Sequence, residues 1–141
     1  GLDLSRRRED LDARLLGLDA KVRGLVAPLP AIRRVLVTGH ESLGYFADRY
    51  GFKVVGAVVP SFSSQAESSA SELAALKLLV EADGVPAIFT EVGTNAKVVE
   101  VLAREAKVRA VPLAMHGLPK GGGYAEYLLG LATTITGALA P

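Results

Sequence analysis

The feature that most constrains the fold is a regular alternation of short apolar runs and helical patterns from Val35 to Leu139. Four runs have the length and the aliphatic content of buried strands, at residues 35–37, 54–59, 85–89 and 108–113. Helical patterns follow them at residues 43–50, 69–84, 95–106 and 124–139. This alternation predicts an α/β fold with a four-stranded parallel sheet and helices on both faces. Right-handed crossovers favour an order in which the first strand lies between the second and the third.

A long helix is predicted ahead of the first strand, over residues 4–29. Apolar residues recur there at steps of three, four or seven, which places them on one helical face. They are Leu4, Leu11, Leu15, Leu18, Val22, Leu25 and Leu29. Pro28 and Pro30 end the pattern, because proline cannot continue a helix. At about 25 residues it exceeds the usual 8–20 of a globular helix, so we interpret it as a helix that serves more than one lobe.

Composition narrows the class of protein. The chain has 141 residues and no cysteine, which fits one domain and excludes a disulfide scaffold, a thiolate zinc site and a cysteine nucleophile. Its 16 basic and 15 acidic side chains leave a net charge of +1, so no nucleic-acid partner is predicted. Half of the residues are hydrophobic, yet no charge-free apolar run reaches the ~18 residues of a transmembrane segment.

Side chains that can bind metal follow the predicted strands. His40 comes after the first strand, Glu91 after the third and His116 after the fourth. In parallel sheets, ligands bind at the carboxyl ends of the strands, at the switch point between the first and third strands. Imidazole and carboxylate are common ligands of zinc and of harder divalent ions. The spacing therefore indicates a metal site at this edge, with Glu41 as a competing ligand.

Structural roles remain open for the same side chains. A single histidine in a loop is more often a surface or structural residue than a ligand. Glu91 also suits the start of a helix capped by Thr94 or Asn95. Glu41 suits a first helical turn, where the helix dipole favours an acidic side chain. The glycines at 121–123 lack the spacing of a phosphate-binding loop and are interpreted as a flexible turn.

Residues 37–51, VTGHESLGYFADRYG, resemble a segment of the metal-binding solute-binding proteins of zinc and manganese ABC transporters. The likeness continues in the long helix, in IFTE at residues 88–91 and in the closing helix, so it covers nearly the whole chain as the second half of a family member. The resemblance implies two α/β lobes joined by one rigid helix, with the metal between them. Residues 1–30 are then the linking helix and residues 31–141 the C-terminal lobe, and the N-terminal lobe is absent from this chain.

The resemblance also implies roles for single residues. His40 stands at the position of a metal ligand of the C-terminal lobe, and His116 stands at or near the position of an acidic fourth ligand. Histidine in place of that acid favours Zn²⁺ over the alternative, Mn²⁺. Glu91 and Glu41 are assigned to the surroundings of the ligands or to the cleft. Because one lobe holds only part of the ligand set, this half alone is expected to bind metal weakly or not at all.

The function implied is capture rather than catalysis. An extracytoplasmic receptor, in the periplasm or anchored to the cell surface through the absent N-terminus, binds the ion and delivers it to an ABC permease. Half of such a receptor exposes the leucines of its long helix, so a homodimer of the fragment through that helix is a further expectation. The alternative is a small hydrolase or transferase with an active site at the switch point, although the sequence lacks a nucleophile or cofactor-loop motif for it.

Overall fold

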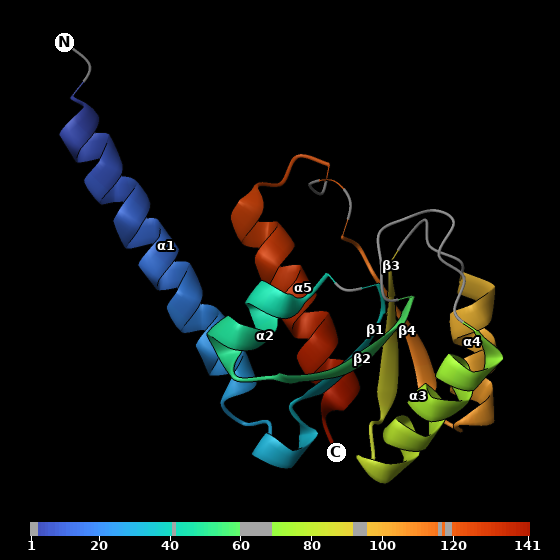
Figure 1. Ribbon diagram of the computed structural model, residues 1–141. Coiled ribbons are helices and arrows are strands. Elements are labelled where there is room, and N and C mark those ends of the chain that lie inside the picture. The colour runs from blue at the N-terminus through green and yellow to red at the C-terminus, as the bar shows by residue number, and fades with distance from the viewer. Residues whose placement is uncertain (1–2, 41, 60–68, 92–95, 116, 118–119) are drawn as a thin grey trace.

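The computed structural model of the chain describes residues 3–40, 42–59, 69–91, 96–115, 117 and 120–141. The helices and strands in chain order are α1 (Leu4–Val26), β1 (Val35–His40), α2 (Gly44–Tyr50), β2 (Lys53–Val59), α3 (Ala70–Ala82), β3 (Ala87–Glu91), α4 (Ala96–Glu105), β4 (Arg109–Leu113) and α5 (Tyr124–Leu139). A 3-10 turn at Ala31–Arg33 connects α1 to β1. Within the described residues the strands form one parallel sheet in the order β2-β1-β3-β4, which confirms the predicted fold class and strand order (Figure 1).

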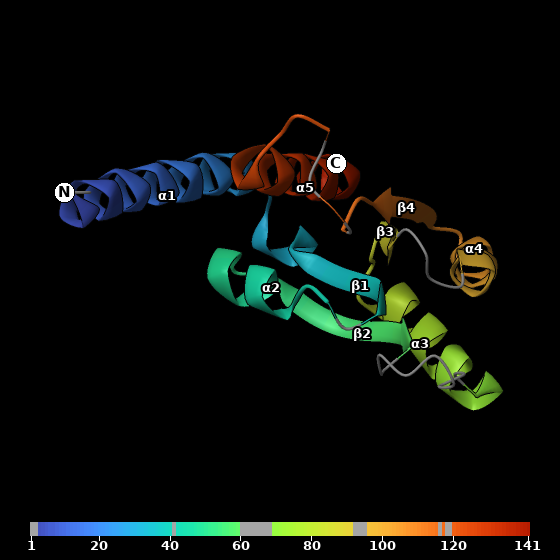
Figure 2. The same cartoon turned by 90° about the horizontal axis from the view of Figure 1, so that it is seen from above.

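Helices cover both faces of the sheet, as Figure 2 shows from above. Two consecutive residues of β3 show how the sequence produces the two layers. Phe89 packs in a core with residues of α1, α2 and α5, whereas Ile88 packs in a second core with residues of α3 and α4. Both side chains are fully buried, because successive residues of a central strand point to opposite faces.

Several element ends follow from local chemistry. Gly51 ends α2 in the left-handed conformation at φ 74°, as expected of glycine after a helix. Ser69 begins α3 with a capping box, in which its hydroxyl accepts from Glu72 N and the Glu72 carboxylate accepts from Ser69 N. The third strand begins at Ala87 and not at Val85, a correction of two residues. Val85 N still donates to Val80 O of the preceding helix, and Pro86 follows without an N–H.

Helix α1 is buried over only part of its length. Val22, Val26 and Leu29 lie in one core with residues of α5, and Leu18 is buried one turn before them. By contrast, Leu4, Leu11, Leu15 and Leu25 are exposed. The predicted apolar seam was therefore wrong at Leu25, because Val26 is the buried residue at this point of the helix. The first half of α1 extends beyond the rest of the fold, and none of the described residues covers its leucines (Figure 1).

Lys107 follows α4 in a conformation that disfavours its side chain. Its φ is 57°, in the left-handed region, where the backbone conformation of an L-residue is less favourable by roughly 1–2 kcal/mol. We expect Lys107→Gly to raise the free energy of unfolding by about 0.5–1 kcal/mol after the extra chain entropy of glycine is subtracted. Urea denaturation measures this change. Glu100→Gly, at an exposed position in the interior of α4, is the matched control and should lower stability by about 1 kcal/mol; a loss of stability in both variants would contradict the expectation.

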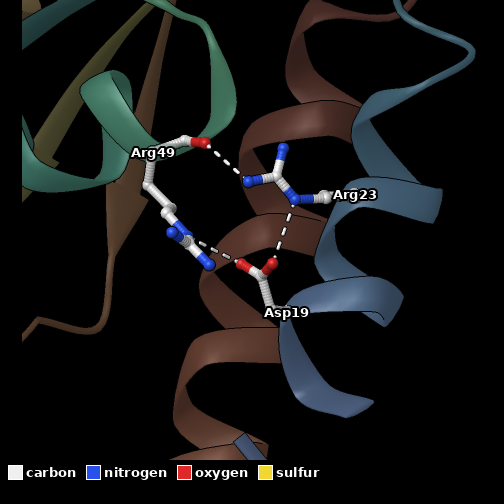
Figure 3. Close-up of polar contacts among 3 residues, drawn as sticks. All are labelled: Asp19, Arg23 and Arg49. Atoms are coloured by element: carbon white, nitrogen blue, oxygen red, sulfur yellow. Dashed lines mark hydrogen bonds and ion pairs between the residues drawn. The ribbon is translucent and has the colours of Figure 1, made fainter. Parts of the chain in front are cut away.

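An ion cluster joins α1 to α2, in addition to the core that the two helices share (Figure 3). Asp19 Oδ1 lies 2.9 Å from Arg49 Nε, and Asp19 Oδ2 lies 3.0 Å from Arg23 Nε. The Arg23 guanidinium also donates to the Arg49 carbonyl oxygen at 3.3 Å and lies 5.7 Å from the centre of the Tyr50 ring. The hydrogen bonds from Arg49 and then from Arg23 lower the pKa of Asp19 from 3.8 to about 2.

This lowered pKa predicts a stability that depends on acid. A carboxylate with a pKa of about 2 when folded and 3.8 when unfolded stabilises the fold fully above pH 3.8, and its contribution is lost as the pH falls through about 2. Between pH 4 and pH 2 the urea midpoint of the parent should therefore fall more steeply than that of Asp19→Asn. Asp12→Asn is the control, because Asp12 is an exposed carboxylate of the same helix whose ion pair with exposed Arg8 is long, at 3.9 Å. Parallel profiles for the parent and Asp19→Asn would rule this contribution out.

Candidate metal centre

Two predicted site residues end neighbouring strands at the same edge of the sheet. His40 is the last residue of β1 and Glu91 is the last residue of β3. Thr38 is in register with Phe89, and His40 and Glu91 each lie two residues further along. Both were expected in the loops that follow the strands; they belong to the strands themselves, because each strand runs one or more residues beyond its apolar core. The structure thus brings His40 and Glu91 to one edge.

The two side chains also share a face of the sheet. Leu36 of β1 and Phe89 of β3 pack in the core beneath α2 and α5. Because side chains alternate along a strand, His40 and Glu91 lie on that same face. Glu91 is 5% exposed and His40 is half-buried. This edge of the sheet therefore carries two possible metal-binding groups. The His40 imidazole is partly exposed to solvent, and the Glu91 carboxylate is buried.

Hydroxyl groups on both sides of His40 connect this part of the chain. Ser42 donates a hydrogen bond to Glu91 Oε1, which ties the segment after β1 to the end of β3. Thr38 donates to the His40 carbonyl oxygen, and the Ser42 hydroxyl lies 3.4 Å from the same oxygen. Sequence reasoning did not identify Thr38 and Ser42 as site residues. The signal available was their position two residues before and two residues after His40.

The other two candidates, Glu41 and His116, lie outside the described residues. The described neighbour Met115 places the segment after β4 near this edge. Its N–H donates to Leu113 O at 3.0 Å, and Leu113 is in register with Glu91. Among the residues that the structure describes, no three His, Asp or Glu side chains lie close enough together to hold a metal ion. The described part of the edge therefore offers one imidazole and one supporting carboxylate.

A groove of about 490 Å³ opens beside the candidate site, between α1, α2 and α5. All four tyrosines of the chain line it, together with Ser42 and Met115. Tyr50 and its neighbour Phe46 are core residues, whereas Tyr45 is 94% exposed. The groove thus lies between the strand ends and the exposed half of α1, with aromatic rings along it. No helix among the described residues is long and apolar enough to cross a membrane.

Comparison with known proteins identifies relatives of this fold and sequence. The profile of the family described as zinc-uptake complex component A, periplasmic, matches residues 3–138. The zinc-binding protein TroA of Treponema pallidum is 36% identical over 115 residues, which are 82% of this chain and 37% of TroA. The manganese-binding lipoprotein MntA of Bacillus subtilis is 29% identical over 100 residues, which are 71% of this chain and 32% of MntA.

The solved structures agree with the sequence relatives. The periplasmic zinc-binding protein TroA from Treponema pallidum superposes with a TM-score of 0.79 and 33% identity, over 97% of this chain and 52% of the TroA chain. The chain thus spans about half of that structure and a smaller share of the full sequences. Because the family profile matches nearly the whole chain, the chain belongs to the family of periplasmic zinc-uptake component A proteins, which are solute-binding proteins and not enzymes.

Proposed function

We propose that the chain is the C-terminal half of an extracytoplasmic receptor that captures a divalent metal ion and delivers it to an ABC permease. The observation that carries the proposal is the position of His40, at the end of β1 and next to the end of β3, in a chain that matches the zinc-uptake family from residue 3 to residue 138. The similarity to TroA, a zinc-binding protein, and to MntA, a manganese-binding lipoprotein, supports a metal cargo. The family membership excludes the alternative of a small hydrolase or transferase.

In this proposal His40 and His116 are the ligands that this half contributes. A neutral imidazole at His40 coordinates the ion, while Thr38 and Ser42 hold the backbone oxygen of the same residue. Glu91 accepts a hydrogen bond from Ser42, which holds Ser42 at the end of β3. Two imidazoles and no thiolate suit zinc as the first cargo and manganese as the second. The protein binds and releases the ion without catalysing a reaction.

The proposed division of the chain assigns residues 1–30 to a linking helix and residues 31–141 to the C-terminal lobe. The chain spans only 52% of the solved TroA structure, and its α1 exposes Leu4, Leu11 and Leu15. An apolar face of this kind is suited to pack on an N-terminal lobe that precedes it. In the isolated half, the same leucines are available for a second copy of the chain. Capture between two lobes outside the cytoplasm, in the periplasm or at the cell surface, follows from this assignment.

Zinc titration calorimetry on two proteins tests the proposal. The complete receptor, with the lobe that precedes Gly1, is expected to bind one zinc ion at least about 100-fold more tightly than the 141-residue chain, because the chain holds only part of the roughly four ligands that zinc requires. Titrations with manganese and with magnesium show which of the three ions the receptor binds most tightly. Equal zinc affinity for the two proteins would contradict a site shared between lobes, and a receptor that binds none of the three ions would overturn the proposed function.

A further inference from the structure

Helix α2 connects the candidate site to the linking helix. It begins at Gly44, four residues after His40, and ends at Tyr50 against α1. Just before α2, Ser42 donates a hydrogen bond to Glu91 of β3. In the last turn of α2, Arg49 donates to Asp19 of α1. The position of α2 is therefore set by polar contacts at both ends. One of these belongs to the candidate site, and the other to the helix that leaves the lobe.

Asp19 is the centre of the second contact (Figure 3). Its two oxygens accept from two arginines of different helices, at 2.9 Å from Arg49 and 3.0 Å from Arg23. Its side chain is 18% exposed, whereas Asp12, in the outer part of α1, is 61% exposed. The side chains of Arg23 and Arg49 are 53% and 57% exposed, so solvent partly screens these ion pairs, and what distinguishes them is the convergence of two hydrogen bonds on one carboxylate. Without the Asp19 charge, two guanidinium groups would face each other with no anion between them.

The remaining contacts of α1 with the lobe are less directional. Val22 and Val26 pack with residues of α5 as an apolar face, and packing of this kind leaves a scatter of roughly 15–20° in the angle between two helices. From Asp19 to Leu4 the helix runs for 15 residues, or roughly 22 Å. A tilt of about 10° at Asp19 therefore moves Leu4 by roughly 4 Å. Metal–ligand distances tolerate only about 0.2 Å, so a small change in angle here is large for a site built by two lobes.

We infer that Asp19 is a positioning residue that locks the angle of α1 on α2 and so sets how the preceding lobe is carried over His40. The angle lock stands on the contacts of this chain, and its effect on metal binding rests on the proposed function. Asp19 touches no metal in this scheme and acts through Arg49 and α2. Arg23 closes the lock from the α1 side through the Arg49 carbonyl oxygen.

Distances between two nitroxide labels test the angle directly, without metal. The chain has no cysteine, so Glu9→Cys on α1 and Gly44→Cys at the start of α2 give two unique labelling positions. Both residues are exposed, and a Cβ at Gly44 meets nothing within 4 Å. Pulsed electron paramagnetic resonance should give one narrow distribution of label-to-label distances in the parent. Asp19→Asn should broaden that distribution and shift its mean, because Arg23 and Arg49 then repel each other.

Two further variants make the result specific to the lock. Arg49→Gln removes the same bond from the α2 side and should also broaden the distribution, but with a smaller shift, since no like charges remain in opposition. Asp12→Asn removes an exposed carboxylate of α1 and should leave the distribution as in the parent. An unchanged distribution in both Asp19→Asn and Arg49→Gln, with parent-like circular dichroism, would overturn the angle lock.

Zinc affinity of the complete receptor supplies the second arm of the test. Asp19→Asn should weaken zinc binding by about tenfold, in the range found for residues that orient metal ligands from behind them, and Asp12→Asn should not. A shifted label distance with unchanged zinc affinity would overturn the positioning role. A receptor whose parent form binds no metal would refute the proposed function, while the label distances would still decide the angle lock.

Discussion

Replacing His40 by alanine in the complete receptor is expected to lower its zinc affinity by about 100-fold or more. In the proposed site, the change removes one of the roughly four ligands that zinc requires, and alanine offers the ion no donor in place of the imidazole at the end of β1. Because the His40 backbone oxygen is held by Thr38, the strand end should keep its position and water should fill the open coordination site. Competition against a chromophoric chelator measures the affinity.

The matched variant for this experiment is Tyr45→Ala. Tyr45 follows His40 by five residues and lines the groove beside the site, but its side chain is 94% exposed and carries no strong zinc donor. It should leave zinc affinity within about twofold of the parent, a range expected of surface substitutions. Unchanged zinc affinity in His40→Ala, together with parent-like circular dichroism, would show that the ion binds elsewhere.

Phe89→Ala is expected to lower the free energy of unfolding by about 3–5 kcal/mol, the range for loss of a buried aromatic side chain. Phe89 lies at the centre of β3, is fully buried, and packs beneath α2 and α5. It is in register with Thr38, so the cavity left by its ring would open directly under the strand ends that carry His40 and Glu91. Urea denaturation followed by circular dichroism gives the magnitude.

Two comparisons make this result informative. Ile88→Ala, on the opposite face of the same strand, removes a buried side chain beneath α3 and α4 and should cost about 2–5 kcal/mol. In the complete receptor, however, Phe89→Ala should reduce zinc affinity more than Ile88→Ala, because only Phe89 supports the face on which His40 lies. A loss below about 1 kcal/mol for Phe89→Ala would contradict its place in the core.

The order of the strands was predictable because it depends on general rules of chain connection rather than on particular contacts. Alternating apolar runs and helical patterns imply parallel strands, and right-handed crossovers then leave few orders. The juxtaposition of His40 and Glu91 followed from the same rules, since both residues end strands that become neighbours. Strand boundaries were less accurate. The start of β3 depends on how far α3 and its following turn extend, and Val85 N still donates to Val80 O of α3.

The contacts that hold the site could not be predicted in the same way. Ser42 and Glu91 are 49 residues apart, and their bond depends on the path of the segment after β1 and on the burial of the carboxylate. Asp19 and Arg49 are 30 residues apart, and a chain with 16 basic and 15 acidic side chains offers many equivalent pairs. Only the crossing of α1 and α2 selects this one. Which leucines of α1 are exposed likewise depends on how far α5 extends along α1. The apolar periodicity of α1 carries no information about this.

The length of the free part of α1 also has a consequence for rotational phase. Each residue of an α-helix advances by 1.5 Å and turns by about 100°. In the proposed receptor, the azimuth of the preceding lobe relative to the sheet would therefore depend on the number of residues between Leu4 and Asp19. One added residue would swing it by more than a quarter of a circle, whereas seven added residues would return it to within about 20° of its starting azimuth. Evolution can lengthen this helix by pairs of turns far more easily than by single residues.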